Sequence, residues 1–484
     1  MYFHGIKVPS ARLYEPLEKK QLKLIHRASL ELLEDVGIEV SNKKALDLFC
    51  NNGANADRAK NRVFLPRDMV EEAISTAPSK VLLAGRNEKY DLHLEKFRVY
   101  MGGGGVSEKV IDLESGAKRN AVIEDIVSFA RLADALGHVH FQQFMVIPPG
   151  LPAKDRLLYQ FYHILKNTGK HVMGGVISLE ELEKVVKLGE IICGGRKSLQ
   201  ERPPVSFINC LMISPLRMDC RVADLVMETA AQGLPQAIPT APTSGVTAPI
   251  TLAGTTLMQN TEALAGIVLT QLVNPGAPVL YSTVSSVVDM FNLSFMFGAV
   301  ELGVLAASGA QMARYYDIPM YGTGGATDSK FSDQQAGFEK ALTLLTAALG
   351  GVNIVHDTAG QLESITTVGY EQMVIDNEVN GMVCQIIRGV DFSEERLAKS
   401  VISEVGPGGN FLTTPHTIKY LRTEHYNPRV SDRLKESAWI ERGMLDLRSR
   451  ARVETQRILE TNADLSFDED VRLALAREFP RLVD

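Results

Sequence analysis

The 484 residues of this chain include 51 lysine and arginine against 58 aspartate and glutamate residues, a net charge of −7. The chain therefore has no excess of basic residues, which argues against nucleic acid as a partner. The composition is ordinary for a soluble enzyme, and the five cysteines lack the spacing of a disulfide framework. The first residues lack a signal-peptide pattern and no apolar run is long enough to span a membrane, so we expect a cytoplasmic protein.

Helical spacing dominates the first hundred residues. Apolar residues recur with a helical period over 17–33, and 43–51 and 67–76 are predicted as further helices. A hairpin is expected near 80–101. Residues 1–100 are therefore predicted to form a helical N-terminal extension packed on the main domain.

From about residue 100, helices and strands alternate along the chain. Seven helical segments each precede a short apolar run; the predicted strands lie near 138–147, 170–175, 204–214, 235–240, 277–283, 318–322 and 351–356. A further strand is expected near 403–411. Because parallel strands need long crossovers, the pattern predicts a (β/α)₈ barrel over 101–411, with an open doubly wound sheet as the alternative. Residues 412–484 are predicted to be a charged, helical C-terminal segment.

The most informative stretch is 351–360, an apolar run that ends in His356, Asp357 and a glycine turn. The run at 318–325 ends in a similar glycine-rich loop, which leads to Asp328. Loops of this kind at the carboxyl ends of parallel strands are where α/β proteins place their chemistry. His356 can donate a hydrogen bond to an anionic oxygen. The negative charges of Asp328 and Asp357 can attract a cation. A metal site around His356 and Asp357 is an alternative that no ligand spacing supports.

Other motifs have both a functional and a structural interpretation. The run 102–105, four glycines, can line the barrel mouth or form a tight turn, but it lacks the Lys-Ser/Thr of a phosphate loop. Arg217 can hold a substrate carboxylate or pair with Asp219. The small-residue loop 240–251, which includes Thr243, can form a flat rim for a large partner or an ordinary loop.

Aromatic residues lie in and after the predicted strand at 277–283. Tyr281, Phe291, Phe295 and Phe297 can contribute to a cage around a quaternary ammonium, because aromatic faces attract cations. Most aromatic residues in such a run belong to the core, which is the alternative.

Several of these segments together resemble the trimethylamine methyltransferase superfamily, from about residue 15 to 440. The matching segments are 102–105 with 112–116, 214–216, 247–254, 271–278, 370–372 and 404–411. The resemblance implies a (β/α)₈ barrel that moves a methyl group from a methylated amine to the cobalt of a separate corrinoid protein. The founding trimethylamine enzymes carry pyrrolysine, which is absent here, so the chain is similar to the non-pyrrolysine branch that demethylates quaternary amines.

The implied activity is that of a quaternary amine:corrinoid methyltransferase. Glycine betaine is the favoured substrate, with proline betaine, carnitine or γ-butyrobetaine as alternatives. A metal-dependent barrel hydrolase or lyase and a non-catalytic betaine-binding module are the alternatives of other classes. A quaternary ammonium leaves as a neutral amine and needs no general acid. A strong carboxylate contact at its nitrogen would stabilise the substrate more than the transition state.

The predicted substrate site is assigned to seven residues: His356, Asp357, Tyr281, Phe291, Phe297, Arg217 and Asp328. Within it, His356 contacts the distant substrate carboxylate and Asp357 orients His356. A corrinoid-facing rim is assigned to Gly102, Gly103, Thr243 and Gly324. The corrinoid (cobalamin) is expected on a partner protein, without a bound metal or nucleotide in this chain, and the chain is expected to be a homo-oligomer.

Overall fold

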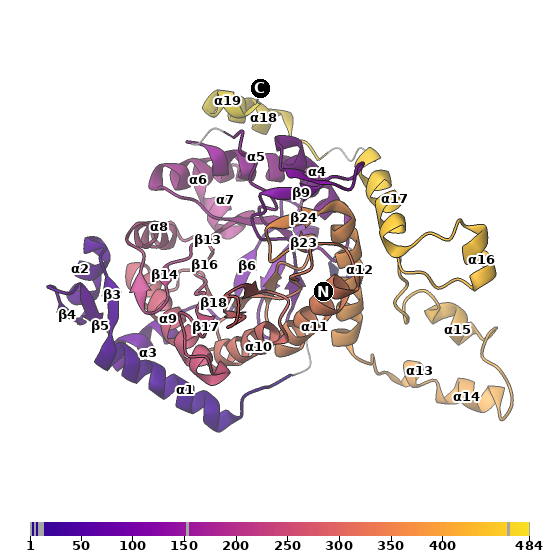
Figure 1. Cartoon of the computed structure of the whole chain (residues 1–484), viewed down its shortest axis with the longest axis horizontal. Coiled ribbons are helices and arrows are strands. Elements are labelled where there is room, and N and C mark those ends of the chain that lie inside the picture. Colours follow the sequence, from indigo (N-terminus) through magenta and orange to yellow (C-terminus); the bar gives the residue numbers. More distant parts are fainter. Residues whose placement is uncertain (1, 4–5, 8–13, 152–153, 462–464, 484) are drawn as a thin grey trace.

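A computed structural model describes residues 2–3, 6–7, 14–151, 154–461 and 465–483 of the chain. Eight parallel strands form the central sheet in the order β11-β12-β13-β16-β18-β21-β22-β8. A parallel bridge between Gly102, which follows β8, and Phe141 in β11 closes the sheet into a ring. Helices surround this ring (Figure 1). The predicted (β/α)₈ barrel is confirmed.

Each barrel strand leads to a helix that packs on the outside, and β12 is followed by a second, short helix, α7 (Arg196–Glu201). The strands are β8 (Tyr100–Met101), β11 (Phe141–Gln142), β12 (His171–Gly174), β13 (Val205–Ile208), β16 (Gln236–Ala237), β18 (Val279–Thr283), β21 (Met320–Thr323) and β22 (Ile354–His356). The helices that follow them are α4 (Ile123–Ala135), α5 (Arg156–Asn167), α6 (Leu179–Cys193), α8 (Cys220–Ala231), α9 (Leu252–Val273), α10 (Val300–Tyr315), α11 (Gln334–Gly350) and α12 (Tyr370–Arg388).

The prediction of a strand near 403–411 is wrong. Residues there belong to helix α14 (Lys399–Val405) and the turn after it, and the remaining barrel strand is β8, which precedes the others. β8 has only two residues and runs into Gly102, where an added Cβ would lie 2.6 Å from the Phe141 side chain. So short a strand, ending in glycine, carries too few side chains for its pattern to be recognised.

The N-terminal region combines helices with a small sheet. Helices α1 (Lys19–Glu31), α2 (Lys43–Asn51) and α3 (Arg67–Thr76) accompany strands β3 (Ile38–Val40), β4 (Asn55–Asp57) and β5 (Arg62–Phe64). This sheet also contains β14 (Met212–Ile213) and β15 (Arg217–Met218), which lie in the loop that follows barrel strand β13. The hairpin of β6 (Val81–Leu83) and β7 (Leu92–Leu94) closes the amino end of the barrel, because its apolar side chains cluster with those that point inward from the strands.

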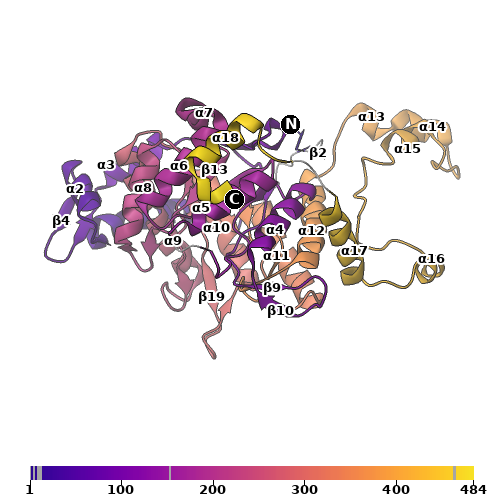
Figure 2. The same cartoon turned by 90° about the horizontal axis from the view of Figure 1, so that it is seen from above.

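Two small sheets lie beyond the carboxyl ends of the barrel strands. One is formed by β17 (Thr243–Ser244), β19 (Ser286–Val288) and β20 (Phe295–Met296). The other is formed by β9 (Lys109–Ile111), β10 (Lys118–Asn120), β23 (Gln361–Leu362) and β24 (Thr367–Gly369). Figure 2 shows β19 and β10 projecting on the same side of the molecule. This side is the mouth of the barrel.

The C-terminal region consists of further helices. α17 (Leu447–Glu460) packs against α12 and α4, and α18 (Glu469–Glu478) packs against α6. In contrast, α13 (Glu394–Leu397), α14 and α15 (Pro415–Tyr420) stand away from the barrel, as does α16 (Glu436–Glu441) (Figures 1 and 2). Across the described ranges, no helix is long and apolar enough to cross a membrane.

Candidate active site

His356, the last residue of β22, has both ring nitrogens engaged within the chain. Its Nδ1 lies 2.9 Å from the carbonyl oxygen of Gly322, and its Nε2 lies 3.0 Å from Oδ2 of Asp357. A carbonyl and a carboxylate both accept hydrogen bonds, so the arrangement is satisfied when both nitrogens carry protons. His356 is therefore best described as an imidazolium paired with the Asp357 carboxylate.

The electrostatics agree with this description. Burial by itself lowers the pKa of His356, but the charge of Asp357, the hydrogen bond to it and the Gly322 carbonyl together raise the pKa above its ordinary value. Burial would raise the pKa of Asp357, yet the His356 charge and the hydrogen bonds from His356 and Thr323 hold that pKa below its ordinary value. Each partner thus keeps the other charged.

Asp357 adopts an unusual backbone conformation, with a φ of 65°. Its Oδ2 also accepts a 2.8 Å hydrogen bond from the Thr323 hydroxyl, whereas its buried Oδ1 has no hydrogen-bond partner among the described residues. Gly105 approaches this oxygen so closely that an added Cβ would lie 2.9 Å from Oδ1. A strained, incompletely satisfied carboxylate at the end of a barrel strand is a feature of functional sites.

Tyr321 of β21 stacks on His356 inside the barrel, with ring centroids 4.7 Å apart and an interplanar angle of 18°. Gln143, directly after β11, donates from Nε2 to the Tyr321 hydroxyl oxygen at 3.2 Å and lies 3.4 Å from the sulfur of Met173 in β12. Burial, the first of several causes, raises the pKa of Tyr321 well above its ordinary value. The phenol therefore keeps its proton, and because its oxygen accepts from Gln143, that proton can be donated elsewhere.

The glycine run 102–105 lies directly against this cluster. An added Cβ at Gly104 would lie 2.2 Å from Oε1 of Gln143 and 3.3 Å from the ring of His356. Gln361 donates to the carbonyl oxygens of Gly104 and Gly105, the second at 2.9 Å, and accepts from Ser107 at 2.9 Å. The glycines thus allow the backbone to approach the polar cluster closely, and Gln361 holds that backbone in place.

A buried ion pair supports the loops on either side of Asp357. Lys340 of α11 and Asp376 of α12 lie 3.1 Å apart, and each side chain is 2% exposed. Lys340 donates to the Gly325 carbonyl at 2.6 Å, and Asp376 accepts from the Gly360 amide at 2.6 Å. The pair therefore links the loop after β21 to the loop after β22.

Tyr281 does not belong to this interior cluster. Its side chain is fully buried on the outer face of β18, where its hydroxyl donates to Asn260 of α9 at 2.9 Å. In the register between β18 and β21, Tyr281 pairs with Met320, while Ser282 pairs with Tyr321. Since successive residues of a strand point to opposite faces, the prediction that Tyr281 lines the substrate site is wrong.

The other predicted substrate contacts lie at or outside the rim. Phe291 is fully exposed at the tip of the β19–β20 hairpin, and Phe297 is half-buried. Asp328 accepts from the backbone amides of Phe297 and Gly298 at 2.9 and 3.1 Å, and from Ser364 at 2.6 Å. Its carboxylate thus joins three loops and is not presented to a cation, which corrects its assignment as a substrate contact.

Arg217 is also displaced from the mouth. It is exposed on β15, in the small sheet shared with the N-terminal region, and pairs in register with Glu39. Among the predicted rim residues, Thr243 is buried in β17, with its hydroxyl 3.2 Å from that of Ser286. Gly324 packs beneath α11, where an added Cβ would lie 3.1 Å from Ala347. Of the four residues predicted to form the corrinoid-facing rim, Gly102 and Gly103 alone lie beside His356 and Asp357 at the mouth.

The residues that sequence reasoning missed are Tyr321, Gln143 and Gln361. Tyr321 and Gln143 lie in segments that were predicted as strands, and a polar residue at the end of a barrel strand is the signal that could have found them. Gln361 follows the glycine turn after Asp357 and belongs to a short strand, β23, that no pattern indicated.

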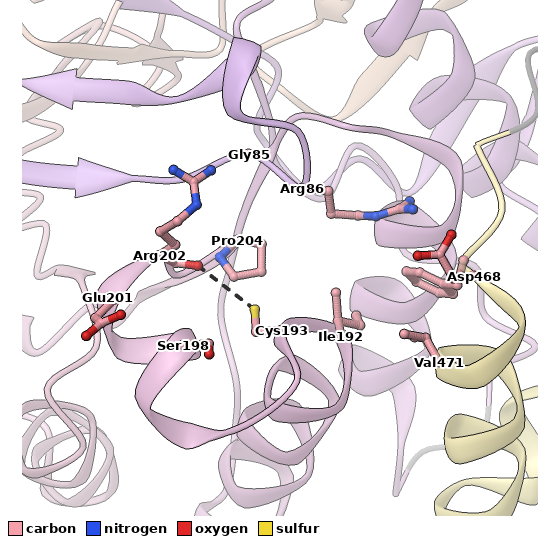
Figure 3. Close-up of a pocket in the computed structure, with 11 residues that line it drawn as sticks. Gly85, Arg86, Ile192, Cys193, Ser198, Glu201, Arg202, Pro204, Asp468 and Val471 are labelled. Carbon is pink, nitrogen blue, oxygen red and sulfur yellow. Dashed lines mark hydrogen bonds between the residues drawn. The ribbon is translucent and has the colours of Figure 1, made fainter.

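A cleft of about 380 Å³ lies at the opposite, amino end of the barrel (Figure 3). Its two arginines are already engaged: Arg86 donates to the backbone carbonyls of Thr168 and Leu465, at 3.3 and 2.9 Å, and Arg202 forms an ion pair with Asp91. Burial raises the pKa of the Cys193 thiol to about 11, so this sulfur is not a thiolate at neutral pH. The arginines and the thiol of this cleft are thus not prepared for chemistry, and the mouth, at the carboxyl ends of the strands, is the candidate site.

Fold and site together define a barrel enzyme whose chemistry lies at the carboxyl ends of the strands. The family model described as "Trimethylamine methyltransferase (MTTB)" matches residues 5–481. The chain belongs to this family, and it is a methyltransferase.

Relatives of known name match over most of the chain. It is 35% identical over 460 residues to the glycine betaine methyltransferase of Desulfitobacterium hafniense strain Y51, covering 95% of each chain. It is 36% identical to the trimethylamine methyltransferase MttB of D. hafniense strain DCB-2, covering 91% of this chain and 88% of the other. Among solved structures, the monomethylamine methyltransferase MtmB of Methanosarcina barkeri shares the fold, with a TM-score of 0.54, 12% identity and coverage of 94% and 89%.

Proposed function

We propose that this chain removes a methyl group from a quaternary amine, with glycine betaine favoured, and passes it to the Co(I) of a separate corrinoid protein in the cytoplasm. The similarity to a glycine betaine methyltransferase, which covers 95% of both chains, supports this substrate class. Proline betaine, carnitine and γ-butyrobetaine are alternatives for the same reaction.

The observation that carries the proposal is the mutual engagement of His356 and Asp357 at the mouth. Each of the two groups holds the other in its charged form, so neither is prepared to exchange a proton with a leaving group. Departure of a quaternary ammonium as a tertiary amine requires no proton. A site with this arrangement therefore suits a quaternary amine, whose nitrogen already carries the positive charge.

The Tyr321 hydroxyl, not a His356 nitrogen, is our proposed contact for the substrate carboxylate. Both His356 nitrogens are used within the chain, whereas Tyr321 accepts from Gln143 and retains its own proton to donate. Because burial keeps the phenol protonated, its O–H remains available to donate to an anionic oxygen. His356 and Asp357 then act as positioning residues that hold the Tyr321 ring.

The mouth also fits a large partner that must bring a reactive atom to it. The glycines at 103–105 place backbone, without side-chain bulk, beside Met145, Gln143 and Asp357. Phe291 and Phe295, which are 101% and 54% exposed, offer apolar contact area on the adjacent hairpin. When bound, the partner's corrinoid supplies a strongly nucleophilic Co(I), and the part of this chain is to orient the substrate N–CH₃ bond and exclude water.

The test is methyl transfer from several amines with the purified chain, its corrinoid protein or free cob(I)alamin, and a reductant. We expect loss of the Co(I) absorbance with glycine betaine and formation of one dimethylglycine per Co(I) consumed. Proline betaine, carnitine, γ-butyrobetaine and trimethylamine form the comparison series. Activity on trimethylamine alone would overturn the substrate class, and binding of betaine without Co(I) loss would favour a binding module.

The alternative of a metal-dependent hydrolase finds little support in the geometry. Within the described part of the chain, one group could hold a metal: His138, His140 and Cys384. The two histidines precede β11, at the amino end of the barrel and away from the mouth. His140 Nδ1 accepts the Met101 amide at 2.9 Å, so in the neutral ring Nε2 carries the proton and is no ligand. Stoichiometric zinc that is lost together with activity would reverse this conclusion.

A further inference from the structure

Cys210 lies just beyond the end of β13, where alternate residues point into the barrel. Ile208 packs with the apolar side chains that fill the barrel interior, whereas Phe207 belongs to the cluster outside the strands. Leu211 also lies outside, in the cluster that includes residues of α9. Since successive residues of an extended chain point to opposite faces, Cys210 points inward, at the mouth end of the same face as Ile208.

The register of the strands places Cys210 in one inward layer with Tyr321. β13 pairs with β16 at Ile208 and Ala237, two residues before Cys210. Ala237 in turn pairs with β18 two residues before Ser282, and Ser282 pairs with Tyr321 in β21. Around the barrel wall, one residue of β16 and Ser282 therefore stand between the Cys210 thiol and the Tyr321 ring.

The Cys210 thiol is open to solvent although protein surrounds it. Cys210 is exposed, and the inward residues Ile208 and Val284 are partly exposed. The protein around the thiol nevertheless removes enough water to raise its pKa. A negative charge on Cys210 would also raise the pKa of Tyr321, so the two groups lie within electrostatic reach of each other. These properties together describe a group on the inner wall of the mouth, next to the proposed carboxylate contact.

The two sides of Tyr321 differ in what they leave open to a substrate. On the side of β22, the ring of His356 stacks on Tyr321 at 4.7 Å. On the side of β18, the layer continues through the small side chain of Ser282 to Cys210. In glycine betaine a single methylene separates the carboxylate from the nitrogen. With the carboxylate at the Tyr321 hydroxyl, the ammonium therefore lies close by, on the open side that leads to Cys210.

We propose that the side chain of Cys210 contacts the methyl groups of the substrate ammonium, an inference that rests on the proposed methyl transfer. Sulfur is polarisable and packs well against methyl groups. The thiol is also neutral, because the surrounding protein raises its pKa. A carboxylate at this position would stabilise the charged substrate more than the transition state, in which the positive charge is being lost. A neutral contact avoids that penalty.

The first test compares Cys210→Asp with Cys210→Asn, two variants of the same shape that differ in charge. Relative to the Asn variant, the Asp variant should have a KM for glycine betaine about tenfold lower and a kcat about tenfold lower. Initial rates of Co(I) loss measure both constants, and circular dichroism confirms that each variant is folded. Equal constants in the two variants would remove Cys210 from the site. A higher KM in the Asp variant would place Cys210 at the carboxylate end, which also overturns the proposal.

The second test labels the wild-type thiols and is decisive if a variant does not fold. N-ethylmaleimide should label Cys210 about tenfold more slowly at a glycine betaine concentration about ten times its Kd. Cys220 is the internal control, because it is exposed at the start of α8, outside the barrel. Its labelling rate should not change with betaine. Trypsin cleaves after Arg217 and places the two cysteines on different peptides, which mass spectrometry measures separately.

Labelling and methyl transfer give separate answers. Methyl transfer from an amine that leaves Cys210 unprotected would overturn this inference and leave the proposed function intact. Protection of Cys210 by an amine that causes no Co(I) loss would overturn the proposed function and keep Cys210 in the binding site. Absence of both overturns both. A Cys210 that stays unlabelled in the free protein while Cys220 reacts would show that the mouth does not reach the thiol, and this result also overturns the inference.

Discussion

The two ends of the barrel both bury ionisable side chains, but these side chains find their hydrogen-bond partners differently. At the amino end, Lys170 is fully buried and donates to the backbone carbonyls of Ala133, Leu136 and Val139 at 2.5–2.8 Å. At the mouth, His356 and Asp357 satisfy each other, and one carboxylate oxygen has no partner among the described residues. Burial of charge therefore does not by itself identify a functional site.

The backbone differs between the ends in degree. Four residues at the mouth, Asp357, Glu363, Ser364 and Ile365, have φ values between 51° and 66°, whereas Lys96 and Asp317 at the amino end have φ values of 49° and 55°. Residues in this region are strained, and the strain must be supported by surrounding contacts such as the Lys340–Asp376 pair. The hydrogen bonds from Lys170 to backbone carbonyls indicate a structural role. The pairing of the His356 and Asp357 side chains on a strained loop indicates a site for chemistry.

The largest effect is expected at the amino end. Lys170→Met should lower the free energy of unfolding by about 3 kcal/mol, because three buried carbonyl groups lose their donor. Guanidinium unfolding followed by circular dichroism measures the loss. KM and kcat per folded molecule should stay at wild-type values, since the substitution lies away from the mouth. A raised KM would show that the two ends are coupled.

At the mouth, the expected effect is on turnover. Asp357→Asn removes the charge that keeps His356 protonated and in place, and kcat/KM for glycine betaine should fall about 100-fold. Initial rates of Co(I) loss provide the measurement. The matched control is Asp376→Asn, which should mainly reduce stability. A kcat/KM within threefold of wild type for Asp357→Asn would remove the His356–Asp357 pair from the proposed site.

A smaller effect is expected for the proposed carboxylate contact. Tyr321→Phe keeps the ring that stacks on His356 and removes only the hydroxyl, so KM for glycine betaine should rise about tenfold with little change in kcat. Tetramethylammonium, which lacks a carboxylate, serves as the control substrate, and any activity on it should be unchanged by the substitution. Equal losses on both substrates would assign Tyr321 a structural role.

The smallest effect is the pH dependence of stability. The His356 pKa is raised in the folded protein, so its contribution is complete below the ordinary histidine value of 6.5 and is lost as pH rises through the folded pKa. The Asp357 pKa is lowered, so its contribution is complete above 3.8 and is lost as pH falls through the folded pKa. The stability difference between wild type and Asp357→Asn should therefore be largest near pH 5.

Unfolding midpoints at pH 5 and pH 9 measure this difference. We expect the difference to be smaller at pH 9 than at pH 5, because the contribution of His356 is lost as pH rises through its raised pKa. A difference that grows from pH 5 to pH 9 would contradict the assignment of His356 as an imidazolium paired with Asp357.

Much of the fold could be predicted because its helices and strands have clear local patterns. Helices α2 and α3 occupy the ranges predicted for them, 43–51 and 67–76, and the seven strands predicted between residues 138 and 356 all contribute to the barrel. Strand β8 and helix α14 could not be recognised. The first has two residues before a glycine, and the second is a short segment whose few apolar residues do not distinguish a helix from a strand.

The candidate site was predicted less completely, because the sequence did not show which residues of each strand point into the barrel. Tyr281 and Tyr321 both lie in strands buried on two faces, where apolar residues form continuous runs with no alternation to show which side points inward. Asp328 was chosen for its charge, but its oxygens are used by backbone amides of a neighbouring loop.

The sequence by itself determined the alternation of strands and helices, because this alternation follows from the local hydrophobic pattern. The barrel followed from the alternation. The position of His356 and Asp357 at a strand's carboxyl end followed from the direction of parallel strands. Only the tertiary structure decided that Tyr321 faces the interior, that both nitrogens of His356 are engaged within the chain, and that no side chain of residues 390–422 is buried. These properties depend on register and on contacts between distant segments, which no local pattern records.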